Sequence, residues 1–399
     1  MLAMLSSSSA KYSKVVVTER TYACTDGVKL STRHWSNDFE SESNDNLRRT
    51  RKILCLHGWL DNSASFNQLA PCLLENLSLG SSSSDDTIKE NVDIIPTEIV
   101  ALDFPGHGLS SHKSVDGPPQ LLAEYAYYAA ELIEALQWGD NGSTANMVDG
   151  KTTHDNDTQQ SETTINDNSA KESNKIILVG HSMGSGVAIV LCAAFPEWFS
   201  GLVLLEGGLV ARSANDASRH VRSACQRRLR SNRTLFPNVN DGTSTSSSNT
   251  RAKVYSNLEA AIKARLSTTE RMPGDQTLSY EAARDMVVRA TLPANKNDND
   301  NEAVVFRHDP RLQWPSLQYY TREQVEAFMR DVRTSTVPTC FLSAADGWPT
   351  DAWIESVVKD ELQPVHLKRL SGSHHFHADP DTVGAVAREV VAFINELNS

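Results

Sequence analysis

Ser182 lies in a short pattern that is typical of a nucleophilic serine. Residues 180–184 read Gly-His-Ser-Met-Gly and stand between an apolar run and a run with helical spacing. The two glycines let the chain turn sharply, which would expose the serine oxygen at a sheet edge and at a helix N-terminus. A serine hydroxyl reacts well only when a base takes its proton and a further group orients that base. The pattern therefore predicts a nucleophile at Ser182 and requires two partners elsewhere in the chain.

Three histidines, His374, His375 and His377, lie within four residues near the C-terminus. A metal site is one interpretation, but histidine is also the side chain best suited to moving protons near neutral pH. No cluster of cysteines or carboxylates accompanies the three, and neighbours on one turn rarely point at one ion. Because they follow the last predicted strand, where the serine needs its base, we expect one of them to be that base and expect no metal.

Two backbone N–H groups are placed to stabilise negative charge. The N–H of Trp59, after the third predicted strand, would lie beside the serine turn and pair with the N–H of Met183. Two such donors can hold the oxyanion of a tetrahedral intermediate. We expect His57 to be structural and Asp61 to cap the following turn or helix. We expect Asp103, after the fourth predicted strand, to bond the N–H groups of the next loop rather than to react.

Eight apolar runs are predicted to form the strands that hold these residues. The first two alternate apolar and polar residues and are separated by Thr-Asp-Gly, which is typical of a β-hairpin. The later runs are continuous, as in strands buried on both faces, and helical patterns lie between them. This order predicts an α/β fold with a mostly parallel sheet covered by helices on both faces. The runs are residues 14–24, 28–35, 52–58, 98–103, 175–181, 201–207, 338–344 and 365–371.

Residues 207–337 lack the strand signal, and helical patterns dominate there. We expect them to form a helical cap over the C-terminal edge of the sheet, with residues 11–206 and 338–399 as the core. Five stretches rich in Ser, Asn, Asp and Thr interrupt the chain, and they cannot bury enough apolar area to offset the entropy of ordering. We expect disordered surface insertions at residues 36–51, 78–93, 140–174, 238–250 and 295–301.

The composition argues against several classes of protein. The chain of 399 residues has a net charge of −12, so a nucleic-acid partner is not expected. No apolar stretch is long enough to span a membrane, and the N-terminus has too short an apolar run for a signal peptide. The C-terminus has no retention or peroxisomal tripeptide. The six cysteines are scattered without a C-x-x-C pair, which indicates a reducing compartment. We expect a cytoplasmic protein, with a peroxisomal location left open, and no obligate protein partner.

Five segments together resemble the serine hydrolase-like, or kraken-like, branch of the α/β-hydrolase superfamily. They are LHGWLDNSASFNQLAPCLL, ALDFPGHGLSSH, VGHSMGSG, DPRLQWPSLQYYTREQV and LSGSHHFH. The resemblance covers nearly the whole chain apart from the polar insertions. It implies an eight-stranded α/β-hydrolase core with a helical lid inserted after the sixth strand. It also implies a catalytic triad in the chain order Ser, acid, His, and no metal or organic cofactor.

The resemblance assigns roles to single residues. It places the nucleophile at Ser182 and the catalytic histidine at His375, which stands immediately before Phe376. His374 occupies a position that usually holds a small residue, and His377 resembles a residue at the rim of the site.

The acid of the triad has three candidates. The first is Asp346, after the seventh strand, although Ala344 and Ala345 stand where a glycine is usual. The second is Glu206, which ends the sixth strand and matches the acid position of some lidded relatives. Asp351 is the third.

These residues lead to a hypothesis about the reaction. We expect a carboxylesterase-like serine hydrolase that cleaves a small carboxylic ester or a related acyl substrate through an acyl-enzyme. The rings of Trp59, Phe104 and Trp348 could line the mouth of the site, although core packing explains each of them equally well. Serine at position 182 argues against haloalkane dehalogenases and epoxide hydrolases, which use aspartate there. A C–C bond hydrolase or an acyltransferase with the same triad, and a ligand sensor of low turnover, remain as alternatives.

Overall fold

The computed structural model describes residues 15–37, 50–78, 95–114, 121–139, 175–235, 253–294 and 302–397. For residues 231–235 only the backbone is described. The predicted disordered insertions, including residues 140–174, lie almost wholly outside these ranges, as do residues 11–14 of the predicted core.

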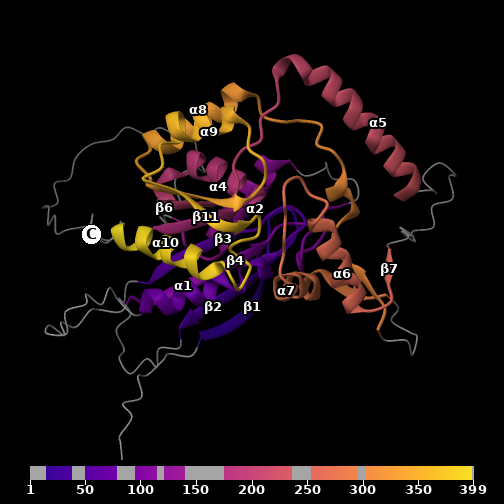
Figure 1. Cartoon of the computed structure of the whole chain (residues 1–399), viewed down its shortest axis with the longest axis horizontal. Helices are drawn as coiled ribbons and strands as arrows, with labels where there is room; N and C mark the ends of the chain where they lie inside the picture. Colours follow the sequence, from indigo (N-terminus) through magenta and orange to yellow (C-terminus); the bar gives the residue numbers. More distant parts are fainter. Residues whose placement is uncertain are drawn as a thin grey trace, which may run out of the picture.

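Eight strands form one sheet at the centre of the protein, in the order β1-β2-β4-β3-β5-β6-β10-β11 (Figure 1). β2 runs antiparallel to both β1 and β4, and all other neighbouring pairs are parallel. The predicted mostly parallel sheet and its N-terminal hairpin are therefore confirmed. The strands are β1 (Val15–Ala23), β2 (Lys29–Asn37), β3 (Arg51–Leu56), β4 (Thr97–Asp103), β5 (Ile176–His181), β6 (Phe199–Leu205), β10 (Thr339–Asp346) and β11 (His366–Ser373).

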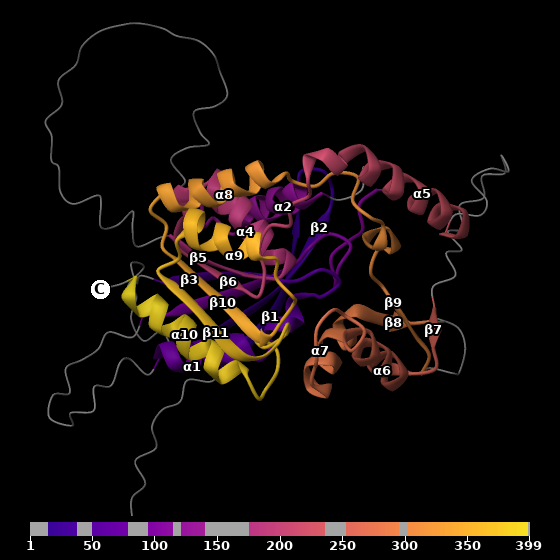
Figure 2. The ribbon, with the colours of Figure 1, turned by 45° about the horizontal axis from the view of Figure 1, so that its top comes forward.

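Helices cover both faces of the sheet, because its central strands bury apolar side chains on both sides (Figure 2). One face packs against α1 (Leu69–Ser78) and α10 (Val383–Glu396). The other face packs against α2 (Leu122–Ala135), α4 (Met183–Ala194), α8 (Arg322–Thr334) and α9 (Ala352–Val357). Since parallel strands end at a common edge, the residues that follow β3, β5, β6, β10 and β11 gather there.

Residues 207–337, the insert, connect β6 to β10. The insert holds α5 (Ala217–Leu235), α6 (Leu258–Thr269) and α7 (Tyr280–Ala290) as well as α8. It also holds an antiparallel sheet of β7 (Val254–Tyr255), β9 (Val304–Phe306) and β8 (Thr291–Pro293). The prediction that the insert has no strands is therefore wrong, because strands of two or three residues are too short to leave a periodic pattern.

The packing of the helices also differs from the predicted boundary between core and cap at residue 337. The insert helix α8 buries Val325, Met329 and Val332 in the same apolar cluster as α2 and α4. By packing, α8 is therefore part of the main body of the protein, although it falls in the segment predicted to form the cap.

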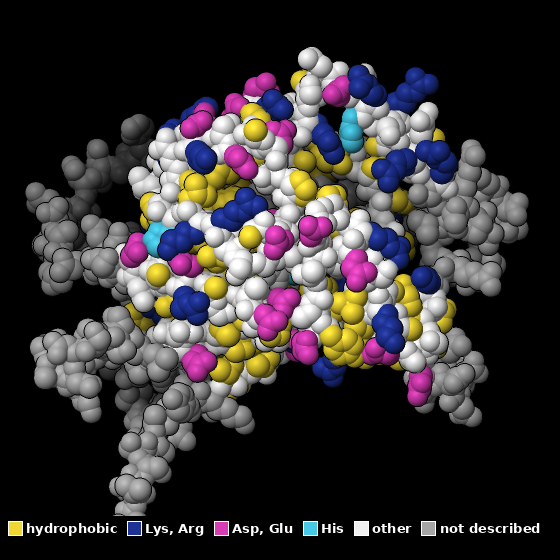
Figure 3. Space-filling view, in the orientation of Figure 1, with side chains coloured by type: hydrophobic (Ala, Val, Ile, Leu, Met, Phe, Trp, Pro, Cys, Tyr) yellow, Lys and Arg dark blue, Asp and Glu magenta, His cyan; other side chains and the backbone are white. Residues whose placement is uncertain are grey.

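Helix α5 extends away from the main body in Figures 1 and 2. Basic side chains gather in that region of the surface at the upper right of Figure 3. The described side chains of α5 include five arginines, at positions 219, 222, 227, 228 and 230. Short helical turns complete the structure: η1 (Ser63–Phe66), η3 (Pro196–Trp198), η4 (Ala214–Asp216), η5 (Pro310–Gln313) and a π-helical turn η6 (Val358–Leu362).

Membrane spans and disulfides were both expected to be absent from this chain. Among the described helices, none combines the length and the apolar character needed to cross a bilayer. All six cysteines are free.

Candidate active site

Ser182 stands on a sharp turn between β5 and α4. Its φ of 52° and ψ of −116° are unusual for a residue with a side chain, and its N–H donates to Leu205 O at 3.0 Å. Glycines make the turn possible. A Cβ at Gly180 would lie 2.5 Å from Gly184 O, and a Cβ at Gly184 would lie 2.1 Å from Leu56 O. The turn therefore holds the serine at the carboxyl edge of the sheet, as the motif predicts.

His374 is the histidine that contacts the serine. Its Nε2 lies 2.9 Å from Ser182 Oγ, and its side chain is buried directly after the end of β11. Two hydrogen bonds hold its backbone: its N–H donates to Gln276 Oε1 at 3.0 Å, and its carbonyl accepts from His181 Nε2 at 2.9 Å. The prediction that His375 faces the serine is therefore wrong by one residue.

Glu206 is the carboxylate beside this histidine. It follows β6 in the left-handed region, with a φ of 47°, and its Oε1 lies 4.0 Å from His374 Nδ1. Both carboxylate oxygens are held by backbone donors, Oε2 by Ala344 N–H at 2.6 Å and Oε1 by Trp348 N–H at 2.8 Å. The second sequence candidate for the acid is thus the one that lies beside His374.

The loop that carries Asp346 plays a different part from the one predicted. The Asp346 side chain is exposed and forms no hydrogen bond with a histidine of the described residues. The loop around it instead wraps the Glu206 carboxylate, and a Cβ at Gly347 would lie 1.9 Å from Glu206 Oε1. Asp351, the third candidate, caps α9 by accepting from Trp353 N–H at 2.7 Å. The structure therefore does not place Asp346 or Asp351 at the serine.

His375 bonds Asp61, and among the described residues it is His374 that contacts the serine. His375 Nε2 lies 3.1 Å from Asp61 Oδ2, and Arg265 Nη2 from α6 donates to Asp61 Oδ1 at 2.5 Å. Burial lowers the pKa of His375, and the nearby Arg265 cation lowers it further, although Asp61 acts in the opposite direction. Burial alone would raise the pKa of Asp61, but His375 and Arg265 hold it well below its ordinary value. Asp61 is therefore a buried ion-pair partner and not the helix cap that we expected.

His377 lies beneath the other two histidines and not at the rim. It is fully buried, and neither of its ring nitrogens has a hydrogen-bond partner among the described residues. Its ring centroid lies 4.0 Å from that of His181 and 5.3 Å from that of Phe66. Burial lowers the pKa of His377 to about 3, so the ring is neutral at physiological pH. In the described residues, no three His, Cys, Asp or Glu side chains are grouped to hold one metal ion.

The loop after β3 runs against the serine. A Cβ at Gly58 would lie 3.2 Å from Ser182 Cβ, so the next N–H, that of Trp59, lies at the same edge as the serine. Met183 is the first residue of α4, where a backbone N–H has no partner inside the helix. His57 Nδ1 donates to Gly58 O at 2.7 Å, and His57 Nε2 accepts from Phe104 N–H at 3.1 Å. His57 therefore fixes this loop, as expected for a structural residue.

The three aromatic rings predicted for the mouth lie in two different environments. The Trp348 side chain is 43% exposed and its ring centroid lies 5.6 Å from that of His374. The Trp59 ring is also exposed, and its Nε1 donates to Leu312 O at 3.0 Å. Phe104 is fully buried in the core against His57. Trp348 and Trp59 are therefore accessible near the site, whereas the prediction for Phe104 is wrong.

Asp103 has the structural role that we expected. Its carboxylate accepts from Ser63 N–H and Leu109 N–H, each at 2.7 Å. It also pairs with Arg289 of α7 at 2.9 Å.

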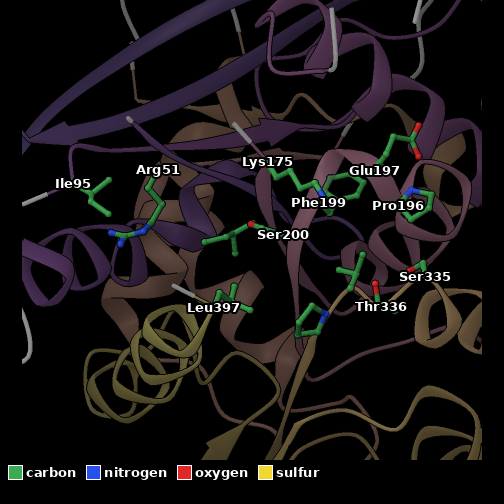
Figure 4. A pocket seen from close by; sticks show the side chains of 13 residues that line it. Arg51, Ile95, Lys175, Pro196, Glu197, Phe199, Ser200, Ser335, Thr336 and Leu397 are labelled. Carbon is green, nitrogen blue, oxygen red and sulfur yellow. The ribbon is translucent and has the colours of Figure 1, made fainter. Parts of the chain in front are cut away.

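A cavity of about 520 Å³ lies at the opposite edge of the sheet from Ser182 (Figure 4). It is lined where β3, β5, β6 and β10 begin, by residues that include Arg51, Lys175, Phe199 and Pro338. Because the serine lies where the strands end, this cavity is separate from the candidate active site.

Two residues of the insert reach the site without having been predicted. Arg265 lies three and four residues after the buried Ile262 and Ala261, so its place on the inward face of α6 could have been found from helical spacing. Gln276 lies in a loop between α6 and α7, and no pattern in the sequence points to it.

Comparisons with known proteins identify the family of this chain. Residues 52–351, more than half of the chain, match the family described as alpha/beta hydrolase fold. A serine hydrolase-like protein of Dictyostelium discoideum is 22% identical over 378 residues, which cover 93% of this chain and 79% of that protein. A serine hydrolase-like protein of Danio rerio is 24% identical over 347 residues, which cover 84% of this chain and 80% of that protein.

Solved structures share the fold. The crystal structure of a hypothetical protein from Pseudomonas aeruginosa aligns with a TM-score of 0.61 and 25% identity, over 94% of this chain and 99% of that one. The chain is a serine hydrolase-like member of the α/β-hydrolase superfamily.

Proposed function

We propose that the protein is a serine hydrolase that cleaves a small carboxylic ester or a related acyl substrate, with Ser182, His374 and Glu206 as its triad. The observation that carries this proposal is the 2.9 Å contact between Ser182 Oγ and His374 Nε2 at a turn with a φ of 52°. The family and the names of the relatives support a hydrolase in general. The ester class and the triad are our extension of that support.

The proposed reaction begins with proton transfer from Ser182 to His374. Nε2 of His374 accepts the hydroxyl proton while Ser182 Oγ attacks the acyl carbon. The N–H groups of Trp59 and Met183 stabilise the oxyanion. His374 then gives its proton to the leaving alcohol, and the acyl group remains on Ser182. In the second half of the reaction, His374 takes a proton from water as the water attacks the acyl carbon. The proton then returns to Ser182 as the acid leaves.

Glu206 supports the positive charge that His374 gains. The 4.0 Å between Glu206 Oε1 and His374 Nδ1 is longer than a hydrogen bond. A shift of about 1 Å would close it, and apo active sites commonly tighten in this way when substrate binds. Ala344 N–H and Trp348 N–H hold the carboxylate in its place beside His374.

Covalent labelling by a fluorophosphonate probe tests the nucleophile. We expect labelling at Ser182 in the wild type and none in Ser182→Ala. Ser185→Ala is a matched control, because Ser185 is a buried serine of the same helix whose hydroxyl donates to Gly180 O. Labelling that persists in Ser182→Ala would remove the serine from the mechanism.

A panel of p-nitrophenyl esters with short to medium acyl chains tests the reaction. We expect hydrolysis by the wild type and by Ser185→Ala, and a loss on the order of 10⁴-fold or more in Ser182→Ala. Tight binding of acyl compounds without turnover would instead support the ligand sensor.

A further inference from the structure

The insert contacts the proposed catalytic machinery through two side chains, Arg265 and Gln276. Arg265 comes from α6, and Gln276 from the loop that follows it. The Arg265 side chain is 12% exposed and Gln276 is buried. Neither contacts Ser182, so any influence on the reaction would act through the residues that they hold.

Arg265 acts through one buried carboxylate that connects three segments. Asp61 belongs to the loop that carries the Trp59 N–H, and its side chain is only 2% exposed. Oδ1 of Asp61 accepts from Arg265 Nη2 at 2.5 Å, and Oδ2 accepts from His375 Nε2 at 3.1 Å. His375 follows the proposed base, His374, directly. The Asp61 carboxylate therefore connects the loop that carries Trp59, the turn that carries His374, and the insert. Charge-assisted bonds of this kind are strong and directional when they are buried.

Gln276 holds the proposed base from the other side. Its Oε1 accepts from His374 N–H at 3.0 Å, and its Nε2 donates to Asp346 O at 3.0 Å. The Asp346 carbonyl belongs to the loop whose N–H groups hold Glu206. One side-chain amide therefore connects the backbone of the base to the loop that orients the acid. Next to it, Ser373 Oγ donates to Thr277 O at 2.5 Å.

A second buried ion pair shows what a purely structural contact of the insert looks like. Arg289 of α7 pairs with Asp103 at 2.9 Å, and the two side chains are 3% and 0% exposed. The other partners of Asp103 are Ser63 N–H and Leu109 N–H, which do not belong to the turn of the base. This pair connects the insert to the core as firmly as Arg265 does, but it does not reach His374.

We propose that residues 265–277 of the insert are a positioning element of the active site. Through Asp61 and His375, Arg265 holds two segments in position relative to each other, the loop that carries the Trp59 N–H and the turn that carries His374. Gln276 fixes the backbone of His374. This inference rests on the proposed triad. It differs from a cap that only selects the substrate, because the insert then sets the rate of the chemical step.

The test compares three variants on the p-nitrophenyl ester that the wild type cleaves best. A displacement of about 1 Å at reacting groups can cost about 10²-fold in rate. We therefore expect Arg265→Gln and Gln276→Ala each to lower kcat by about 10- to 100-fold while KM changes by less than about threefold. Arg289→Gln should lower the melting temperature at least as much as Arg265→Gln, yet keep kcat within about threefold of the wild type.

Several results would overturn the proposal. Wild-type kcat in folded Arg265→Gln or Gln276→Ala would do so, as would an equal loss of kcat in Arg289→Gln. A raised KM with unchanged kcat would assign the two residues to substrate binding instead. Should Arg265→Gln fail to fold, Gln276→Ala decides alone, because it leaves no buried charge unpaired. Ester hydrolysis that survives Ser182→Ala in the same assay would reject the proposed triad, on which the positioning role rests, whereas the results above would reject the positioning role alone.

Discussion

Two acid–histidine pairs lie side by side at the edge of the sheet and differ in what they face. Glu206 lies beside His374, and Asp61 bonds His375. All four residues are buried and the histidines are consecutive. Yet only the first pair reaches Ser182, whereas the second ends at the cation of Arg265.

The chain enters a turn where β11 ends, directly before the two histidines. Gly372 has a φ of 114°, and a Cβ there would lie 2.9 Å from Thr382 Cγ2. The chain thus enters the turn in a conformation that side chains disfavour, and in that turn His374 contacts Ser182 whereas His375 contacts Asp61. The two pairs show that residue type alone does not identify a base.

The partner of each acid explains why only one pair suits proton transfer. A base must gain a proton during the reaction. Glu206 is held by backbone N–H groups beside His374, where we propose that it is the counter-charge of the protonated ring. The charge of Asp61 is already compensated by Arg265, and the same cation disfavours protonation of His375. His375 is therefore suited to holding geometry.

The largest expected difference in kcat is between variants of the two candidate acids, Glu206 and Asp346. Glu206→Gln should lower kcat by about 10³- to 10⁴-fold, because the imidazolium of His374 then loses its counter-charge. Asp346→Asn should stay within about threefold of the wild type, since its carboxylate is exposed and bonds no histidine. Ester hydrolysis by the purified variants measures both. An inactive Asp346→Asn variant together with an active Glu206→Gln variant would instead identify Asp346 as the acid.

A second effect concerns His377, which belongs to neither pair. The pKa of His377 is about 3 in the folded protein, against about 6.5 in an unfolded chain. Below about pH 6.5 the unfolded state binds a proton that the folded state does not, so stability falls as the pH falls toward 3. At pH 5 this single group costs about 2 kcal/mol relative to pH 7.5.

Urea unfolding at several pH values measures that effect. His377→Leu should flatten the fall in unfolding free energy between pH 7.5 and 5 by about 2 kcal/mol. His57, His107 and His181 also have lowered pKa values, caused mainly by burial, so part of the fall should remain. An unchanged pH dependence in His377→Leu would mean that His377 is not held neutral.

The smallest effect tests which pair is open to substrate. Trp348 is exposed and its ring lies near His374, so substrate should approach from that side. Trp348→Ala should raise KM by about three- to tenfold and leave kcat within about threefold. Steady-state kinetics over the ester panel would show this. A fall in kcat at constant KM would instead mean that the Trp348 side chain positions the loop whose N–H groups hold Glu206.

Much of the fold could be predicted, because strands buried on both faces leave continuous apolar runs. The serine could be predicted as well, because its turn requires Gly180 and Gly184. The proposed base was missed by one residue, since a motif of adjacent histidines does not show which of them will contact Ser182. The proposed acid differs from the first sequence candidate because the loop around Asp346 contributes N–H groups, and a sequence pattern shows side chains only. The role of Gln276 depends on the path of an irregular loop, which has no periodic signal.

The central claim is that His374 and not His375 is the base for Ser182, and turnover of the single alanine variants tests it most directly. At equal concentrations of folded protein, His374→Ala should lose on the order of 10⁴-fold in kcat. His375→Ala should lose only about 10- to 100-fold, because it disturbs the position of its neighbour without removing the proton acceptor. A His374→Ala variant that keeps substantial activity while His375→Ala is inactive would contradict the account.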